Sequence, residues 1–194
     1  MPTGRPADAL AAWAVPLAVQ LGVPAVALQA YGYAELTLAR ATPSCRLSWT
    51  TLAGIGKIES DHGRGNGAKL TVDGKALPPI LGAPLDGSAG RDSIPDTDAG
   101  RLDGDSTWDH AVGPMQFIPT SWQQHALDAD TDGVADPNDI DDAALTAGAY
   151  LCASGHDLST PTGWYSAILT YNAVRAYARD VYTAANDYGA HSHA

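Results

Sequence analysis

Glu59 is the residue whose type and position point most directly to chemistry. Leu52, Ile55 and Glu59 stand at i, i+3 and i+7, so a helix over about residues 49–62 would carry all three on one face. Glu59 then takes the place of an apolar residue, and partial desolvation there raises a carboxyl pKa toward the range of a general acid. The alternative is a solvated or ion-paired glutamate at a frayed helix end. Lys57 does not stand three or four residues from Glu59, so the simplest helical ion pair is missing.

Two features of the composition set this position apart. The chain has 22 acidic residues, of which only Glu35 and Glu59 are glutamates, although glutamate is the better helix former. Gly54 and Gly56 weaken the same helix by about 1 kcal/mol each relative to alanine. These glycines make sense if another backbone, or a ligand, must approach this helix closely.

Residues 128–139 have the spacing of an EF-hand calcium loop. Aspartates stand at positions 1, 3, 5, 9 and 12, Gly133 stands at position 6, and Val134 offers its carbonyl at position 7. Position 12 is Asp139 instead of the usual glutamate, which shortens its bidentate reach. We expect a structural Ca²⁺ here, and the alternative is a solvated acidic turn. The predicted ligands are Asp128, Asp130, Asp132, Val134, Asp136 and Asp139.

Cys45 and Cys152 are the two cysteines of the chain. They are either two unrelated buried thiols or one disulfide of an exported protein, and the absence of zinc-type spacing favours the disulfide. Such a bridge would add about 4 kcal/mol to stability in the chain-entropy model.

The elements that must position these residues are mostly helical. The segment 64–112 is rich in Gly, Pro and Asp, lacks helical periodicity and contains one hairpin signal at Asp73-Gly74. Its acidic cluster of Asp96, Asp98, Asp103 and Asp105 is expected to be a solvated loop, with a cleft rim as the alternative. Ile140 and Asp141 are predicted to begin the helix after the calcium loop, with Asp141 as its cap. Helices are expected at about 7–21, 24–41, 49–62, 119–127, 141–154, 162–172 and 174–187. Ser48 is predicted to cap the 49–62 helix and Gly63 to stop it.

Three segments, in order along the chain, carry a family resemblance. Residues 54–60 read Gly-Ile-Gly-Lys-Ile-Glu-Ser, residues 111–119 read Ala-Val-Gly-Pro-Met-Gln-Phe-Ile-Pro, and residues 169–172 read Leu-Thr-Tyr-Asn. Over about residues 24–186 the chain resembles lytic murein transglycosylases of the membrane-bound B type (SLT domain 2-like), in their actinobacterial branch. The resemblance implies a mainly α, lysozyme-like (goose-type or lytic transglycosylase) fold. We therefore expect residues 1–194 to form one catalytic domain with a small β element in the 64–112 insertion.

The resemblance also implies the reaction and the residues that carry it out. Glu59 would protonate the bond between N-acetylmuramic acid and N-acetylglucosamine in peptidoglycan and then act as base toward the C6 hydroxyl, which closes a 1,6-anhydro ring. Because that nucleophile is tethered, no second carboxylate is required. Cleft roles carry over to Gln116, Tyr171 and Asn172, with Ser60 and Met115 as weaker candidates. His62 is equally readable as a partner of Glu59 or as a structural residue.

Two other functions are open at this stage. The first is a muramidase on the same fold, in which an aspartate would place a water molecule. The second is a non-catalytic, calcium-dependent cell-wall-binding module.

Net charge limits the partners of the chain. A formal charge of -11 argues against nucleic acid and anionic membranes as main partners. Residues 1–6 lack the basic and apolar regions of a signal peptide, and no segment reaches the length of a membrane span. We expect an extracytoplasmic monomer whose signal or anchor is absent from this sequence.

Overall fold

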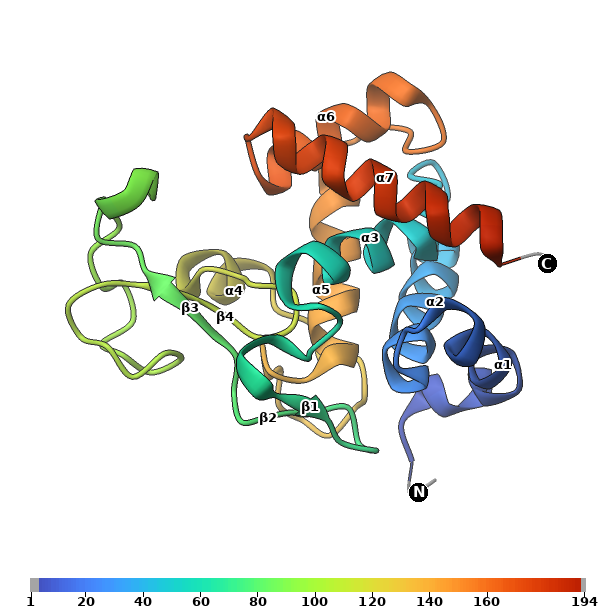
Figure 1. Cartoon of the computed structure of the whole chain (residues 1–194), viewed down its shortest axis with the longest axis horizontal. Helices are drawn as coiled ribbons and strands as arrows, with labels where there is room; N and C mark the ends of the chain where they lie inside the picture. Colours follow the sequence, from blue (N-terminus) through green and yellow to red (C-terminus); the bar gives the residue numbers. More distant parts are fainter. Residues whose placement is uncertain (1–3, 193–194) are drawn as a thin grey trace.

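The computed structural model of the chain describes residues 4–192 and is mainly helical, as predicted (Figure 1). A 3₁₀ turn, Pro6–Leu10, precedes the first α-helix. The last helix runs further than predicted, because its amphipathic pattern continues to His191. The α-helices of the described residues are α1 (Ala11–Leu21), α2 (Ala25–Ala41), α3 (Trp49–Ser60), α4 (Pro119–His125), α5 (Ile140–Ala153), α6 (Pro161–Tyr171) and α7 (Arg175–His191).

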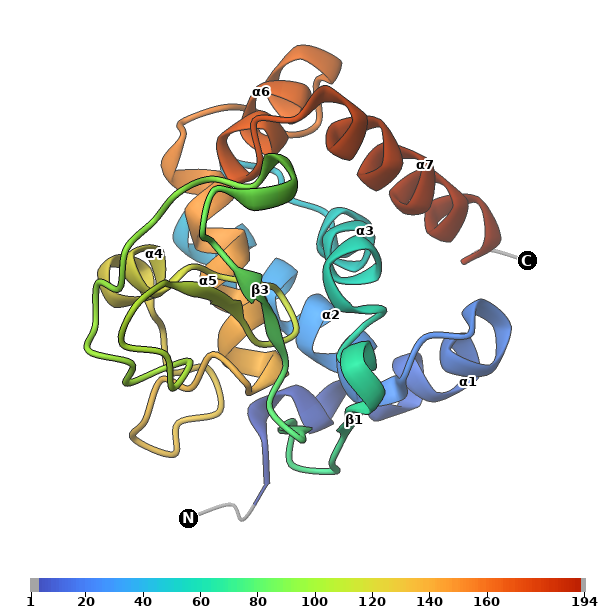
Figure 2. The same ribbon diagram turned by 60° about the vertical axis from the view of Figure 1, so that its left-hand side comes forward.

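Helix α3 lies near the middle of the molecule and packs across α7, while α2 packs along α5 (Figure 2). The side chains of Leu52 and Ile55 on α3 are fully buried, which confirms the predicted core-facing stripe. A Cβ atom at Gly54 would come within 2.8 Å of the carbonyl oxygen of Val181 on α7. Gly54 is therefore needed for the close approach of two backbones, which is one of the two reasons expected for it.

Two short antiparallel strand pairs lie in the long middle segment. Strands β1 (Lys69–Leu70) and β2 (Ala76–Leu77) form the hairpin predicted around Asp73-Gly74. Strands β3 (Leu81–Pro84) and β4 (His110–Val112) form a second pair that sequence reasoning missed. The chain between β3 and β4 forms a lobe that extends away from the helices (Figure 1).

The prediction that Asp141 caps α5 is wrong. Asp139 caps this helix, because its side chain accepts a hydrogen bond from the backbone N–H of Asp141 at 2.8 Å. The carboxylate of Asp141 is buried and instead accepts from Arg5, with Nε to Oδ2 at 2.5 Å and Nη2 to Oδ1 at 2.8 Å. This buried pair joins the start of the described chain to α5, a contact across 136 positions that local sequence rules do not address.

Cys45 and Cys152 form a disulfide, as predicted, with a Cα–Cα distance of 5.3 Å. The bridge joins the segment before α3 to the last turn of α5. Within residues 4–192, no helix combines the length and the apolar character that a membrane crossing requires.

Candidate active site

Helix α3 presents Glu59 on its last turn. Ser48 caps the start of the helix, where its hydroxyl accepts from the N–H of Thr50, as predicted. The helix ends at Ser60, earlier than the predicted end at Gly63, because Asp61 and His62 both adopt left-handed conformations with φ of 51° and 60°. Polar residues such as Asp and His enter this region more readily than most non-glycine residues. Glu59 therefore lies at a sharp and well-defined helix end.

The carboxyl group of Glu59 is half-buried and has one strong partner. Tyr177 on α7 donates a hydrogen bond from its hydroxyl to Oε1 of Glu59 at 2.6 Å. Burial raises the pKa of Glu59 to about 7, against the opposing effect of the Tyr177 hydrogen bond. Lys57 pairs with Asp61 instead of Glu59. A carboxyl group with this pKa is substantially protonated at neutral pH, as a general acid must be.

The buried side chain of His62 holds the end of α3 in place. Its side chain is fully buried, with Nδ1 3.2 Å from the hydroxyl of Tyr31 and Nε2 2.7 Å from the hydroxyl of Tyr188. Burial lowers the pKa of His62 to about 3, so the imidazole is neutral at ordinary pH. A Cβ atom at Gly56 would clash with the hydroxyl of Tyr31, which explains the second glycine of the motif. His62 is therefore structural.

Two hydrogen bonds bring the three sequence motifs together. The buried hydroxyl of Ser60 donates to the carbonyl of Pro114 at 2.6 Å. The hydroxyl of Tyr171 donates to the carbonyl of Met115, also at 2.6 Å. Burial raises the pKa of Tyr171 well above its usual value, and the nearby charge of Glu59 adds to the shift. The turn that contains Pro114 and Met115 is thus held between the ends of α3 and α6.

The predicted cleft residues differ in what they offer a substrate. The side chain of Met115 is fully buried and does not face solvent, while its carbonyl accepts the hydrogen bond from Tyr171. The hydroxyl groups of Ser60 and Tyr171 are engaged in internal bonds. Gln116 and Asn172 are partly exposed, and each carries an amide that can address N-acetyl and hydroxyl groups.

Gln116 is held in an unusual backbone conformation, with φ of 50°. Its Nε2 donates to the carbonyl of Gly113 at 2.9 Å, and a Cβ atom at Gly82 on β3 would lie 2.9 Å from its Oε1. Strand β3 therefore packs directly on Gln116. The 64–112 segment contributes to the site through this backbone contact.

Tyr177 is a residue of the candidate site that sequence reasoning missed. It lies on the buried face of α7 with Ala178 and Val181, a spacing typical of a core stripe. No feature of this pattern indicates that the hydroxyl reaches Glu59, 118 positions away. Only the crossing of α3 and α7 produces the contact.

Removal of the Tyr177 hydroxyl should shift the pKa of Glu59, and with it the pH dependence of any reaction in which Glu59 is the acid. The hydrogen bond to Glu59 favours the ionised carboxylate, so Tyr177→Phe should raise the pKa of Glu59 further. Activity that requires the protonated acid is lost as pH rises through this pKa, so the descending alkaline limb should move to higher pH. Turnover measured from pH 5 to 9 checks this. Tyr188→Phe is the matched control, because Tyr188 lies on the same helix as Tyr177 but bonds to His62. The same alkaline limb in the wild type and both variants would contradict the role of Tyr177 in setting the pKa of Glu59.

The acidic loop after α4 brings three carboxylates together. One carboxylate oxygen from each of Asp128, Asp130 and Asp142 lies within 4.8 Å of the others. Asp142, which was not predicted, also accepts from the N–H groups of Ala129 and Asp136, so it closes the loop from α5. Asp139 lies outside this group. Hard oxygen donors of this kind suit Ca²⁺.

The acidic cluster of the lobe was expected to be a solvated loop, but several of its carboxylates are held by hydrogen bonds. Asp98 and Asp109 are buried, and the carboxylate of Asp109 accepts from both the N–H and the hydroxyl of Thr97. Asp96, Asp98, Asp103 and Asp105 all accept hydrogen bonds from backbone N–H groups of the same lobe. These aspartates organise turns, and this explains their number in a segment without helices.

These helices place a half-buried acid at a helix end within a mainly helical, lysozyme-like fold. Residues 94–165 match the family model of the transglycosylase SLT domain, a range that includes Gln116 and the acidic loop but not Glu59 or Tyr171. The crystal structure of SltB3 from Pseudomonas aeruginosa in complex with NAG-anhNAM-pentapeptide is a structural match with a TM-score of 0.53 and 19% identity. The match covers 92% of this chain and 67% of that chain. A comparison with curated proteins gives no match.

The chain is thus similar to the transglycosylase SLT domain over residues 94–165, and it shares its fold with the SltB3 structure.

Proposed function

We propose that this chain is a lytic transglycosylase that acts on peptidoglycan, with Glu59 as its single general acid and base. The substrate bond is the β-1,4 link between N-acetylmuramic acid and N-acetylglucosamine, and the product is a 1,6-anhydro-muramoyl end. The observation that carries the proposal is the half-buried carboxyl group of Glu59, whose pKa burial raises to about 7. A general acid with a pKa near the working pH contributes most to proton transfer.

Glu59 releases one proton in the first step and takes up another in the second. Glu59 donates its proton to the glycosidic oxygen as the bond to C1 of the muramoyl residue breaks. The resulting carboxylate then takes the proton of the C6 hydroxyl while O6 bonds to C1, which closes the anhydro ring and restores the acid. The tethered hydroxyl replaces a positioned water molecule.

The surroundings of Glu59 support a one-carboxylate reaction. Burial and the Tyr177 hydrogen bond account for its shifted pKa; a second carboxylate nearby would raise the pKa further by like-charge repulsion. The lobe aspartates, which were the candidates for a second carboxylate, accept hydrogen bonds from their own backbone. We assign Gln116 and Asn172 to binding of the substrate, because both residues are partly exposed, Gln116 lies in the turn that Ser60 and Tyr171 hold, and Asn172 directly follows Tyr171.

The products of digestion distinguish this reaction from hydrolysis. Purified peptidoglycan treated with the enzyme should release muropeptides whose terminal muramic acid is anhydro, a mass about 18 Da lower than the hydrolysed form. Mass spectrometry before and after borohydride reduction reads this out, since only a reducing end gains hydrogen. Predominantly reducible products would assign a muramidase instead. Glycan binding without any product would favour the non-catalytic wall-binding module.

We propose that the acidic loop holds a structural Ca²⁺. Asp128, Asp130, Asp132 and Asp136 supply carboxylates, Val134 supplies its carbonyl, and either the predicted Asp139 or the observed Asp142 completes the set. The fit is supported by the three grouped carboxylates and by burial, which raises the pKa of Asp142 to about 6. Calcium would offset the repulsion among these charges and fix the loop between α4 and α5.

Chelation should destabilise the protein. We expect EGTA to lower the melting temperature by about 5 °C or more, because an ion that binds only the folded state stabilises it by mass action. Differential scanning calorimetry with and without added CaCl₂ measures the change. Asp142→Asn should lose most of this response, whereas Asp187→Asn, an exposed substitution on α7, should keep it. An EGTA response of zero in the wild type would contradict the site.

We also propose that the protein works outside the cytoplasm as a monomer. The disulfide supports this location, because such bonds persist in oxidising compartments. The peptidoglycan substrate lies in the same location.

A further inference from the structure

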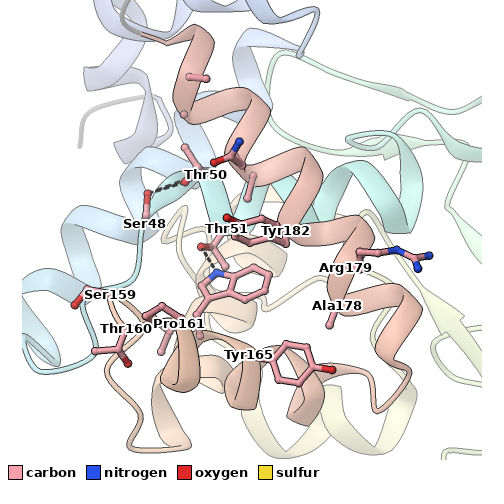
Figure 3. Close-up of a pocket in the computed structure, with 16 residues that line it drawn as sticks. Ser48, Thr50, Thr51, Ser159, Thr160, Pro161, Tyr165, Ala178, Arg179 and Tyr182 are labelled. Atoms are coloured by element: carbon pink, nitrogen blue, oxygen red, sulfur yellow. Dashed lines mark hydrogen bonds between the residues drawn. The ribbon is translucent and has the colours of Figure 1, made fainter.

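One groove of the described residues lies away from Glu59. It has a volume of about 850 Å³ and is enclosed by the first turn of α3, the first turns of α6 and one face of α7 (Figure 3). Thr51, its last residue on α3, precedes Glu59 by eight positions, which corresponds to about 12 Å along a helix. None of the residues assigned to catalysis or substrate binding lines this groove. Its volume is within the range of small-molecule binding sites.

Aromatic side chains form the walls of the groove. Tyr182 is 58% exposed and Tyr165 is 39% exposed, which is high for large aromatic residues. Trp164 meets Tyr182 edge to face with ring centroids 5.7 Å apart, and its indole N–H donates to the hydroxyl of Thr51 at 3.0 Å. The rings are therefore held in place before any ligand arrives, while Tyr165 and Tyr182 remain accessible (Figure 3).

The polar groups of the groove are almost all uncharged. Hydroxyls come from Ser48, Thr50 and Thr160, and an exposed amide comes from Asn186. No acidic residue lines the groove, although the chain carries 22 of them, and Arg179 is its one ionised lining residue. This lining does not suit a metal ion or a basic partner. It suits a neutral ligand with both apolar faces and many hydroxyl and amide groups.

We propose that this groove is a second binding site for N-acetylated glycan, which holds a peptidoglycan strand other than the one being cleaved. Pyranose rings have C–H faces that stack on aromatic rings and a rim of polar groups that hydroxyls and amides can meet. This inference rests on the proposed action on peptidoglycan: a wall built of such strands would surround the protein with this ligand at high concentration. The site would keep the enzyme on the wall between cleavage events. The proposal does not depend on the catalytic role of Glu59.

Chitotetraose, a soluble tetramer of N-acetylglucosamine, is the probe for this site. In ¹⁵N-labelled Glu59→Gln protein, titration should shift the indole N–H signal of Trp164 and the side-chain amide signals of Asn186, with saturation. Tyr165→Ala/Tyr182→Ala in the same background should remove these shifts but leave any shifts at Gln116 and Asn172. Phenylalanine at both positions should restore them, because the rings remain.

Binding to insoluble peptidoglycan tests the same site on the full polymer. The Tyr165→Ala/Tyr182→Ala variant should sediment with sacculi about tenfold more weakly, while its turnover of soluble glycan fragments stays at the wild-type level. Tyr33→Ala, a tyrosine substitution on α2, is the matched control and should bind as the wild type does. Unshifted Trp164 signals at saturating chitotetraose, or unchanged sedimentation of the double variant, would overturn the proposal. A dimer that the double variant disrupts would also overturn it, because the groove would then bind a second copy.

Discussion

Glu59→Gln should lower the rate at which the enzyme solubilises peptidoglycan by about a thousandfold. Glutamine has the size of glutamate and can still accept the hydrogen bond that Tyr177 donates, but it can neither donate a proton to the glycosidic oxygen nor recover one from the C6 hydroxyl. Release of soluble muropeptides over time measures the loss. Glu35→Gln is the matched control, because Glu35 accepts from the N–H of Trp49 at the other end of α3, and it should keep most of the activity. Substantial lysis by Glu59→Gln would remove Glu59 from the mechanism.

The stability of the same variant shows whether its fold is intact. The folded pKa of Glu59, about 7, is raised above the ordinary value of 4.5, so ionisation costs the folded state more than the unfolded state. This contribution to stability is fully present below about pH 4.5 and is lost as pH rises through about 7. Glutamine cannot ionise, so Glu59→Gln should melt a few degrees above the wild type at pH 8 and close to it at pH 4. A lower melting temperature at pH 8 would mean that the substitution acts through the fold.

Loss of the disulfide should cost about 4 kcal/mol of unfolding free energy. The bridge joins residues 107 positions apart, so it removes much of the freedom of the unfolded chain, and both cysteines are buried in the main core. Urea unfolding of Cys45→Ser/Cys152→Ser, compared with the oxidised wild type, measures the loss. The reduced wild type should resemble the double variant. A difference below about 1 kcal/mol would show that unfolded-state structure offsets the constraint.

Helix positions were predicted well where the pattern is local. Ser48 was identified as the cap of α3 because a side-chain oxygen next to the first turn is sufficient. The wrong predictions concern helix ends at which the local sequence offers more than one cap or stop. Asp139 and Asp141 are both suitable caps, and the buried guanidinium of Arg5 decides between them by drawing Asp141 to itself. The early end of α3 depends in the same way on distant Tyr31 and Tyr188, which hold His62 in a left-handed conformation.

The candidate site was only partly visible in the sequence. The apolar stripe drew attention to Glu59, and the three ordered motifs of the family resemblance selected it over a solvated residue at a frayed helix end. Met115 was predicted to contact the substrate because a sequence motif does not show which of its side chains are buried. The side chain of Met115 is fully buried. Strands β3 and β4 were missed because their pairing joins segments separated by the whole lobe.

The sequence by itself determined the helical class, the acid on α3, the acidic loop and the pairing of the two cysteines, since each depends on spacing along the chain or on residue count. Only the tertiary structure decided the pKa of Glu59. Its pKa depends on burial and on the Tyr177 hydroxyl, and both arise where α3 crosses α7 at Gly54. The same holds for Asp142 in the acidic loop and for the aromatic groove, because their groups come from segments that meet only after folding. Periodicity places a side chain on a face of its own helix, whereas packing determines which group lies opposite.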